Sequence, residues 1–135
     1  MLVVLGLALY QYYHVERDRI DDGHNGTDNT VQLAYAAQRS GVWLETSGRV
    51  IRVLRDDNEG SRHQKFILEL DDGHSVLVAH NVDLARRIPV RQGLSLTLRG
   101  RYEWNDRGGV IHWTHHDPEG REQGGWIDVD EVRYE

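Results

Sequence analysis

The residues best suited to chemistry are three histidines within five positions, in the segment IHWTHHD at 111–117. Side chains alternate between the two faces of a strand, so a strand here would place His112 and His116 on the face opposite Ile111. Both imidazoles would project from that face, where they could contribute to one metal site or one phosphate site. Imidazole also titrates near neutral pH, so the pair could serve as a general acid or base.

The same alternation places Thr114 beside His112 and His116. It assigns Trp113 and His115 to the core-facing side with Ile111. The functional histidines of this segment are therefore predicted to be a pair, with further ligands coming from other strands.

Other polar residues fall at the predicted ends of neighbouring strands, which would converge at one rim of a barrel. We expect this rim to bind a ligand through His63, Lys65, His80, Asn81, Glu103, Trp104, Asn105, His112, Thr114, His116 and Asp117. Four of these residues, His63, His80, His112 and His116, could hold zinc or another divalent transition metal, with Glu103 or Asp117 positioning a water. The alternative is a structural role, because histidine and tryptophan often make hydrogen bonds across a sheet.

Aromatic residues accompany the polar ones. Trp104, Trp113 and Trp126, together with Tyr102, are predicted near the same end of the domain. Aromatic side chains on a barrel of this size stack on bases or sugars, although they more often fill the core.

Period-two alternation from residue 42 onward predicts the strands that position these groups. The first strand is long, and the apolar pair Val53-Leu54 predicts a bulge late in it. Asp72-Gly73 is a hairpin signal, and residues 105–109 form another turn. The predicted strands are residues 42–54, 64–70, 74–80, 94–104 and 110–116. Pro118 and Gly120 then predict a tail without sheet.

Two short helices complete the predicted order. Val31, Leu33, Ala34 and Ala37 recur at helical spacing before Gly41, and a second segment at 84–88 precedes Pro89. A short helix, three strands, a helix and two strands is the order of a mainly β, five-stranded barrel of the oligonucleotide/oligosaccharide-binding (OB) type. An SH3-like barrel is the alternative. The short connections exclude a parallel sheet.

The N-terminal residues differ from this domain. Residues 1–14 begin with an apolar run of about half the length that spans a membrane, and we interpret them as a short or truncated signal or anchor segment. Residues 15–29 are rich in glycine and carboxylates, which predicts a flexible linker. The barrel domain with its tail is predicted at 30–135. The N-terminus thus predicts an exported, periplasmic or inner-membrane-anchored bacterial protein.

Charge and composition limit the function. The formal net charge is −6 and there are no cysteines, which excludes disulfides and thiolate metal sites. Residues 42–117 carry eleven basic and eleven acidic residues, so the acidity lies in the flanks. A protein that holds nucleic acid through a surplus of cations is not indicated, although a neutral barrel can still present a local basic face.

The chain resembles a family of small exported bacterial proteins catalogued as a domain of unknown function with an OB-like barrel. The resemblance rests on the motif GGVIHWTHHDP at 108–118 and on the strings GSRHQKFIL at 60–68, AHNVDLA at 79–85 and YEWN at 102–105. It implies export and the same polar rim, and it implies no activity.

These observations predict a binding module rather than an enzyme. Its expected ligand is polar or anionic, either an oligonucleotide or a glycan. A metal-dependent hydrolase acting on phosphodiesters is the competing prediction, and an interaction module of the cell envelope, suggested by the acidic flanks alone, is a third.

Overall fold

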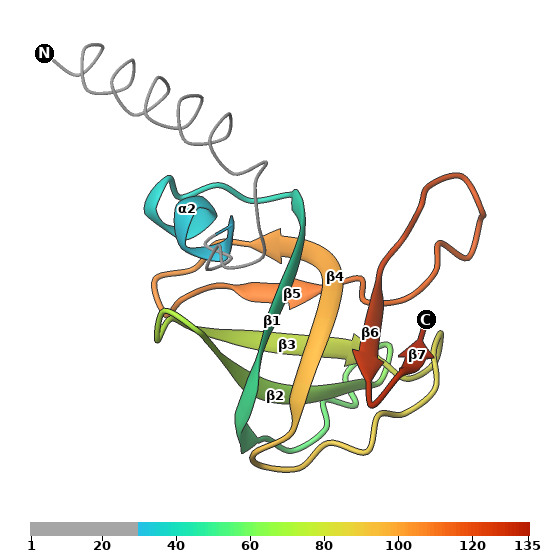
Figure 1. Ribbon diagram of the computed structural model, residues 1–135. Coiled ribbons are helices and arrows are strands. Elements are labelled where there is room, and N and C mark those ends of the chain that lie inside the picture. The colour runs from blue at the N-terminus through green and yellow to red at the C-terminus, as the bar shows by residue number, and fades with distance from the viewer. Residues whose placement is uncertain (1–29) are drawn as a thin grey trace, which may run out of the picture.

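A computed structural model describes residues 30–135, which form one mainly β domain (Figure 1). Within residues 30–135, a single short helix, α2, precedes the strands. The predictions for residues 1–14 and 15–29 lie outside the described residues. The elements are α2 (Thr30–Ala36), β1 (Val42–Val53), β2 (His63–Leu70), β3 (Ser75–Asn81), β4 (Ser95–Glu103), β5 (Val110–His112), β6 (Trp126–Val129) and β7 (Val132–Tyr134).

Five of the strands close into a barrel in the order β1-β2-β3-β5-β4, with β4 returning to pair with β1. All of these pairings are antiparallel except that of β3 with β5, which is parallel. This order, with β1 shared between two neighbours, is that of the OB barrel. The predicted OB-type fold is confirmed, and the SH3-like alternative is wrong.

Strand β1 closes the barrel because its middle pairs on both sides. Gly48 lies opposite Leu70 of β2 and also opposite Leu96 of β4. A Cβ at Gly48 would come closer than 3.0 Å to the carbonyl oxygen of Glu69, so only glycine permits this approach. The predicted bulge is present, three residues earlier than expected, where the register shifts between Val50 and Arg52.

The composition of the core follows from the alternation of buried and exposed residues along the strands. Every second residue of β2 and of β4 is buried, and the apolar ones pack with α2 into one cluster. Helix α2 lies over one end of the barrel (Figure 1), where Val31 and Ala34 are buried. Tyr35 reaches from the helix toward the β4–β5 turn, and its hydroxyl donates to the carbonyl of Asp106.

The helix predicted at 84–88 is wrong. Asn81 does start one turn, since its side-chain oxygen accepts from Asp83 N–H and its carbonyl from Ala85 N–H. The turn does not continue, because side chains take the next backbone groups. His80 bonds the carbonyl of Arg86, and Gln64 bonds both backbone groups of Ile88. Residues 82–94 therefore cross the other end of the barrel as irregular chain.

The last part of the sheet also differs from the prediction. Strand β5 ends at His112, four residues early, because Trp113 has a φ of 55°, and a strand cannot continue through that conformation. The predicted tail instead contains β6 and β7, which extend the sheet from β4. Between β5 and β6, residues 113–125 form a projecting loop (Figure 1). No helix among residues 30–135 has the length and apolarity to cross a membrane.

Candidate functional site

The outer side of β1, β4, β5 and β6 carries three of the four tryptophans of the chain. Two rows of paired residues cross it: Trp43, Arg101 and His112 in the first, and Glu45, Arg99 and Trp126 in the second. We call this surface, with Trp113 and Glu103 beside it, the tryptophan face. It comprises Trp43, Glu45, Arg99, Arg101, Glu103, His112, Trp113 and Trp126.

Trp43 and Trp113 form the centre of the tryptophan face. Their rings meet edge to face with centroids 6.0 Å apart, and the guanidinium of Arg99 lies over the Trp43 ring at 5.2 Å. Cation–π and edge-to-face contacts of this kind hold aromatic rings in fixed orientations. At the margin, Arg133 covers one side of Trp126.

Trp113 was predicted in the core, and that prediction is wrong because its side chain is 36% exposed. The left-handed backbone at Trp113 breaks the alternation, so the following Thr114 and His115 are buried instead. Gly125 makes this path possible. It lies against the carbonyl oxygens of Trp113 and Arg99, where a side chain would not fit. The close approach seats the loop of residues 113–125 on β4.

Each arginine of the tryptophan face lies beside a carboxylate. Arg99 pairs with Glu45 at 3.8 Å, and Arg101 pairs with Glu103 at 3.3 Å. The same Glu103 oxygen lies 3.3 Å from Nε2 of His112. The face therefore presents hydrogen-bond donors and acceptors side by side, with little net charge.

A groove of about 620 Å³ continues the tryptophan face toward the β6–β7 turn. The next cross-strand row, Ser47, Thr97 and Asp128, forms part of its lining. The other charged residues of the lining are mostly acidic, namely Glu69, Asp71, Asp130 and Glu131, with Arg49 as the one cation of the lining. The groove is therefore negatively charged.

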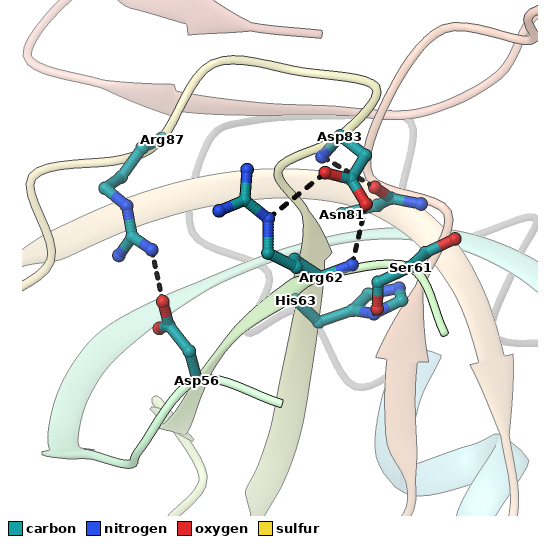
Figure 2. A network of polar contacts seen from close by, with 7 residues as sticks. All are labelled: Asp56, Ser61, Arg62, His63, Asn81, Asp83 and Arg87. Atoms are coloured by element: carbon teal, nitrogen blue, oxygen red, sulfur yellow. Dashed lines mark hydrogen bonds and ion pairs between the residues drawn. The ribbon is translucent and has the colours of Figure 1, made fainter. Parts of the chain in front are cut away.

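The predicted histidine rim lies elsewhere, at the end of the barrel where β2 begins and β3 ends. His63 and Asn81 are paired across these strands. Figure 2 shows that their neighbours form a polar network, in which Asp83 accepts from the backbone and the guanidinium of Arg62. The backbone bond from Arg62 is the main cause that lowers the pKa of Asp83. Nearby, Arg87 pairs with Asp56, tying the β1–β2 loop to residues 82–94.

His80 is buried, and both of its ring nitrogens have partners. Nε2 lies 2.9 Å from the carbonyl of Arg86, and a carbonyl can only accept, so Nε2 carries the proton. Nδ1 then accepts from the hydroxyl of Thr114 at 2.8 Å. Burial is the main cause that lowers the pKa of His80, and the nearby His115 and His63 act in the same direction. The geometry gives His80 and Thr114 a structural role.

His115, which was assigned to the core side, is indeed buried. Its Nδ1 donates to the carbonyl of His116 at 2.7 Å. Burial also lowers the pKa of His115, and the charges of His116, His63 and His112 add to the shift. Five histidines thus lie close enough to interact electrostatically, and His115 rather than the pair His112 and His116 is at their centre.

Stability should therefore fall in mild acid through His80. Because its pKa is lowered in the folded state, the unfolded chain takes up a proton near the ordinary value of 6.5 while the folded chain resists. The stability is complete above that pH and decreases as the pH falls through and below it. We expect the stability difference between the wild type and His80→Gln to shrink from pH 7.5 to pH 5, as measured by urea unfolding. A constant difference over that range would contradict the assignment.

The remaining predicted residues do not join one rim. Trp104 stacks on Tyr35, and Asn105 accepts from two backbone N–H groups of its turn, both at the opposite end beside α2. Asp117 accepts from the backbone N–H groups of Glu119, Arg121 and Glu122 in the projecting loop, bonds that lower its pKa. Lys65 is partly exposed on the outer side of β2. Of the predicted set, only Glu103 and His112 belong to the tryptophan face.

Among residues 30–135, no group of three or more histidine and carboxylate side chains is placed to hold a metal ion. The predicted metal ligands differ in how many of their ring nitrogens already have hydrogen-bond partners. Both nitrogens of His80 are engaged, whereas His63 uses only Nδ1, toward the carbonyl of Ser61.

Four residues of the tryptophan face were missed as candidates, namely Trp43, Glu45, Arg99 and Arg101. The signal was present, since Trp43 and Glu45 alternate with buried Leu44 and Thr46. Trp43 therefore had to face outward. Tyr102, predicted as aromatic surface, is fully buried, and its hydroxyl donates to the carbonyl of Gly108.

Strand order and surface together define the class of protein, a small OB-type barrel with three tryptophans on its outer side. The chain belongs to the family described as "Protein of unknown function (DUF3465)", which matches residues 20–135. The resemblance seen in the sequence is thus confirmed at the level of the family. A search of curated proteins found none that matches the chain.

Proposed function

We propose that this protein is a binding module whose ligand lies on the tryptophan face. The observation that carries the proposal is the placement of Trp43, Trp113 and Trp126. None of them belongs to the core, which is built from smaller aliphatic residues with Phe66 and Tyr102. Large aromatic side chains that remain partly exposed beside polar groups are typical of binding surfaces.

OB barrels often bind their ligands on the outer side of β2 and β3. In this protein that surface has fewer groups for stacking than the tryptophan face. Its outward residues on these strands include Lys65, Ile67, Leu77 and Ala79, and no aromatic residue of β2 or β3 points outward. Phe66, the one aromatic residue on these strands, is fully buried. Stacking, which contributes about 1–3 kcal/mol per aromatic contact, is therefore available on the tryptophan face and not on this one.

Removing either central tryptophan should abolish most of the binding. With ¹⁵N-labelled protein, we expect the indole N–H signals of Trp43 and Trp113 to shift on titration with a neutral hexasaccharide or with dT6. Trp43→Ala and Trp113→Ala should each weaken that binding at least about tenfold, equivalent to about 1.4 kcal/mol.

Trp104→Phe is the matched control, because Trp104 packs on Tyr35 at the α2 end and its replacement keeps an aromatic ring there. It should bind like the wild type. Urea unfolding of each variant separates loss of binding from loss of folding. The proposal fails if no probe moves the Trp43 and Trp113 signals, or if the two alanine variants bind as well as Trp104→Phe.

A further inference from the structure

We infer that the ligand of the tryptophan face is an oligosaccharide without anionic groups. This inference rests on the proposed function, since it names the ligand class of the same surface. Oligonucleotides and oligosaccharides are both known ligands of OB barrels, and both stack on indole rings. They differ in charge, because every nucleotide brings a phosphate.

The cations of the tryptophan face are not free to bind phosphate. Arg99 and Arg101 already lie beside Glu45 and Glu103, and Arg133 at the margin makes two 2.8 Å hydrogen bonds to Asp128. A phosphate approaching any of these arginines would meet the paired carboxylate at the same time. Binding of nucleic acid without sequence preference relies on a positively charged path along the backbone, and this surface provides none.

The groove beside the face strengthens the argument. A strand of nucleic acid that stacked on Trp43 and continued past Trp126 would enter the groove, where carboxylates outnumber the single arginine. Negative potential in a groove repels a polyanion at long range and lowers its rate of association. An uncharged chain meets no such barrier.

Paired arginine and glutamate side chains are well suited to sugar hydroxyls. A hydroxyl both donates and accepts, so it can accept from an arginine N–H that the ion pair leaves free and donate to the carboxylate. The apolar C–H side of a pyranose ring can meanwhile pack on an indole, which is amphipathic in the same way. The edge-to-face arrangement of Trp43 and Trp113, with His112 alongside, offers stacking and hydrogen bonding within one small area.

The test compares probes matched in length on the full chain. Neutral hexasaccharides (cellohexaose, maltohexaose and N-acetylchitohexaose) are titrated beside the anionic hexagalacturonate and dT6, with the Trp43 and Trp113 indole signals as the readout. We expect at least one neutral sugar to bind, with an affinity that changes less than about twofold between 50 and 300 mM NaCl. The two anionic probes should bind at least about tenfold more weakly at 50 mM NaCl.

Glu103→Gln gives a second test, because it should change the affinities for neutral and for anionic ligands in opposite directions. For a neutral sugar, the change replaces a charged acceptor by a weaker one and should lower the affinity severalfold. For an anionic ligand, it removes a repulsive charge and should raise the affinity.

The two proposals fail separately. If dT6 or hexagalacturonate moves the same indole signals more strongly than every neutral sugar, the face is a binding site but the ligand class is wrong. If none of the five probes moves these signals at millimolar concentration, both proposals are overturned.

Discussion

Replacing Gly125 by alanine is expected to destabilise the protein by about 3 kcal/mol, although the change adds one methyl group. A Cβ at this position would lie closer than 3.0 Å to the carbonyl oxygens of Trp113 and Arg99. Both obstacles are backbone atoms, so no side-chain rotation can relieve the overlap. Either β6 must separate from β4 or the loop of residues 113–125 must leave its place.

Gly120→Ala is the control within the same loop. Gly120 has a φ of 65°, and nothing lies within 4 Å of its Cβ position. Its replacement should cost only the strain of the left-handed backbone, about 1 kcal/mol. Urea unfolding with an unchanged m-value measures both variants. Equal stability losses for Gly125→Ala and Gly120→Ala would show that the close approach to β4 does not hold the loop.

The Gly125 substitution also links the fold to the proposed site. The bond from Gly125 N–H to the carbonyl of His115 is short, at 2.7 Å, and closes the base of the loop. Trp113 reaches the tryptophan face only because the chain turns there. A variant that folds with a displaced loop should therefore lose the contact between Trp113 and Trp43, which a shift of both indole N–H signals would report.

The parts of this fold that sequence predicts are those governed by local period. Strands β2, β3 and β4 bury one face against the core, so the alternation of apolar residues fixes both their position and their orientation. The turn at Asp72-Gly73 is equally local, and Gly73 adopts the left-handed conformation that such a turn requires. These elements, in chain order, were enough to predict an OB-type barrel.

The parts that failed depend on contacts distant in sequence. The prediction extended the alternation from Ile111 to His116. In the structure the chain turns at Trp113, where Gly125 packs against the backbone of Trp113 and of Arg99 in β4. The turn exposes Trp113 and buries Thr114, the reverse of the predicted alternation, whereas His115 is buried as predicted. No pattern within residues 110–116 reveals a glycine nine or more positions later.

The predicted rim residues do not lie together, for a related reason. Strand ends were expected to converge on one rim, but β4 and β3 end at opposite ends of the barrel. Trp104 and Asn105 therefore lie beside α2, far along the sheet from the end where His63 and Asn81 pair. The tryptophan face forms on the side of the sheet, across strands rather than at their ends.

Replacing Gln64 by methionine should cost about 2 kcal/mol, although the two side chains have similar volumes. Gln64 is buried, and its amide makes two bonds to Ile88, accepting from the N–H at 2.7 Å and donating to the carbonyl at 2.9 Å. The carbonyl keeps a second partner, the N–H of Val90. The N–H of Ile88 has no alternative, and a buried donor without a partner costs about 1–3 kcal/mol.

The effect of this substitution should extend to the whole connection between β3 and β4. Residues 82–94 form no helix, so side-chain bonds from His80 and Gln64 replace the helical hydrogen bonds that would otherwise order them. Hydrogen exchange at the Ile88 and Val90 amides should accelerate in Gln64→Met beyond what the global loss of stability explains. Lys65→Met is the control, because it introduces the same residue at the neighbouring position, whose side chain points outward. It should change the unfolding free energy by less than about 0.5 kcal/mol. If Gln64→Met matches Lys65→Met in both stability and exchange, the Gln64 amide does not order this segment, and another contact must hold it against the barrel.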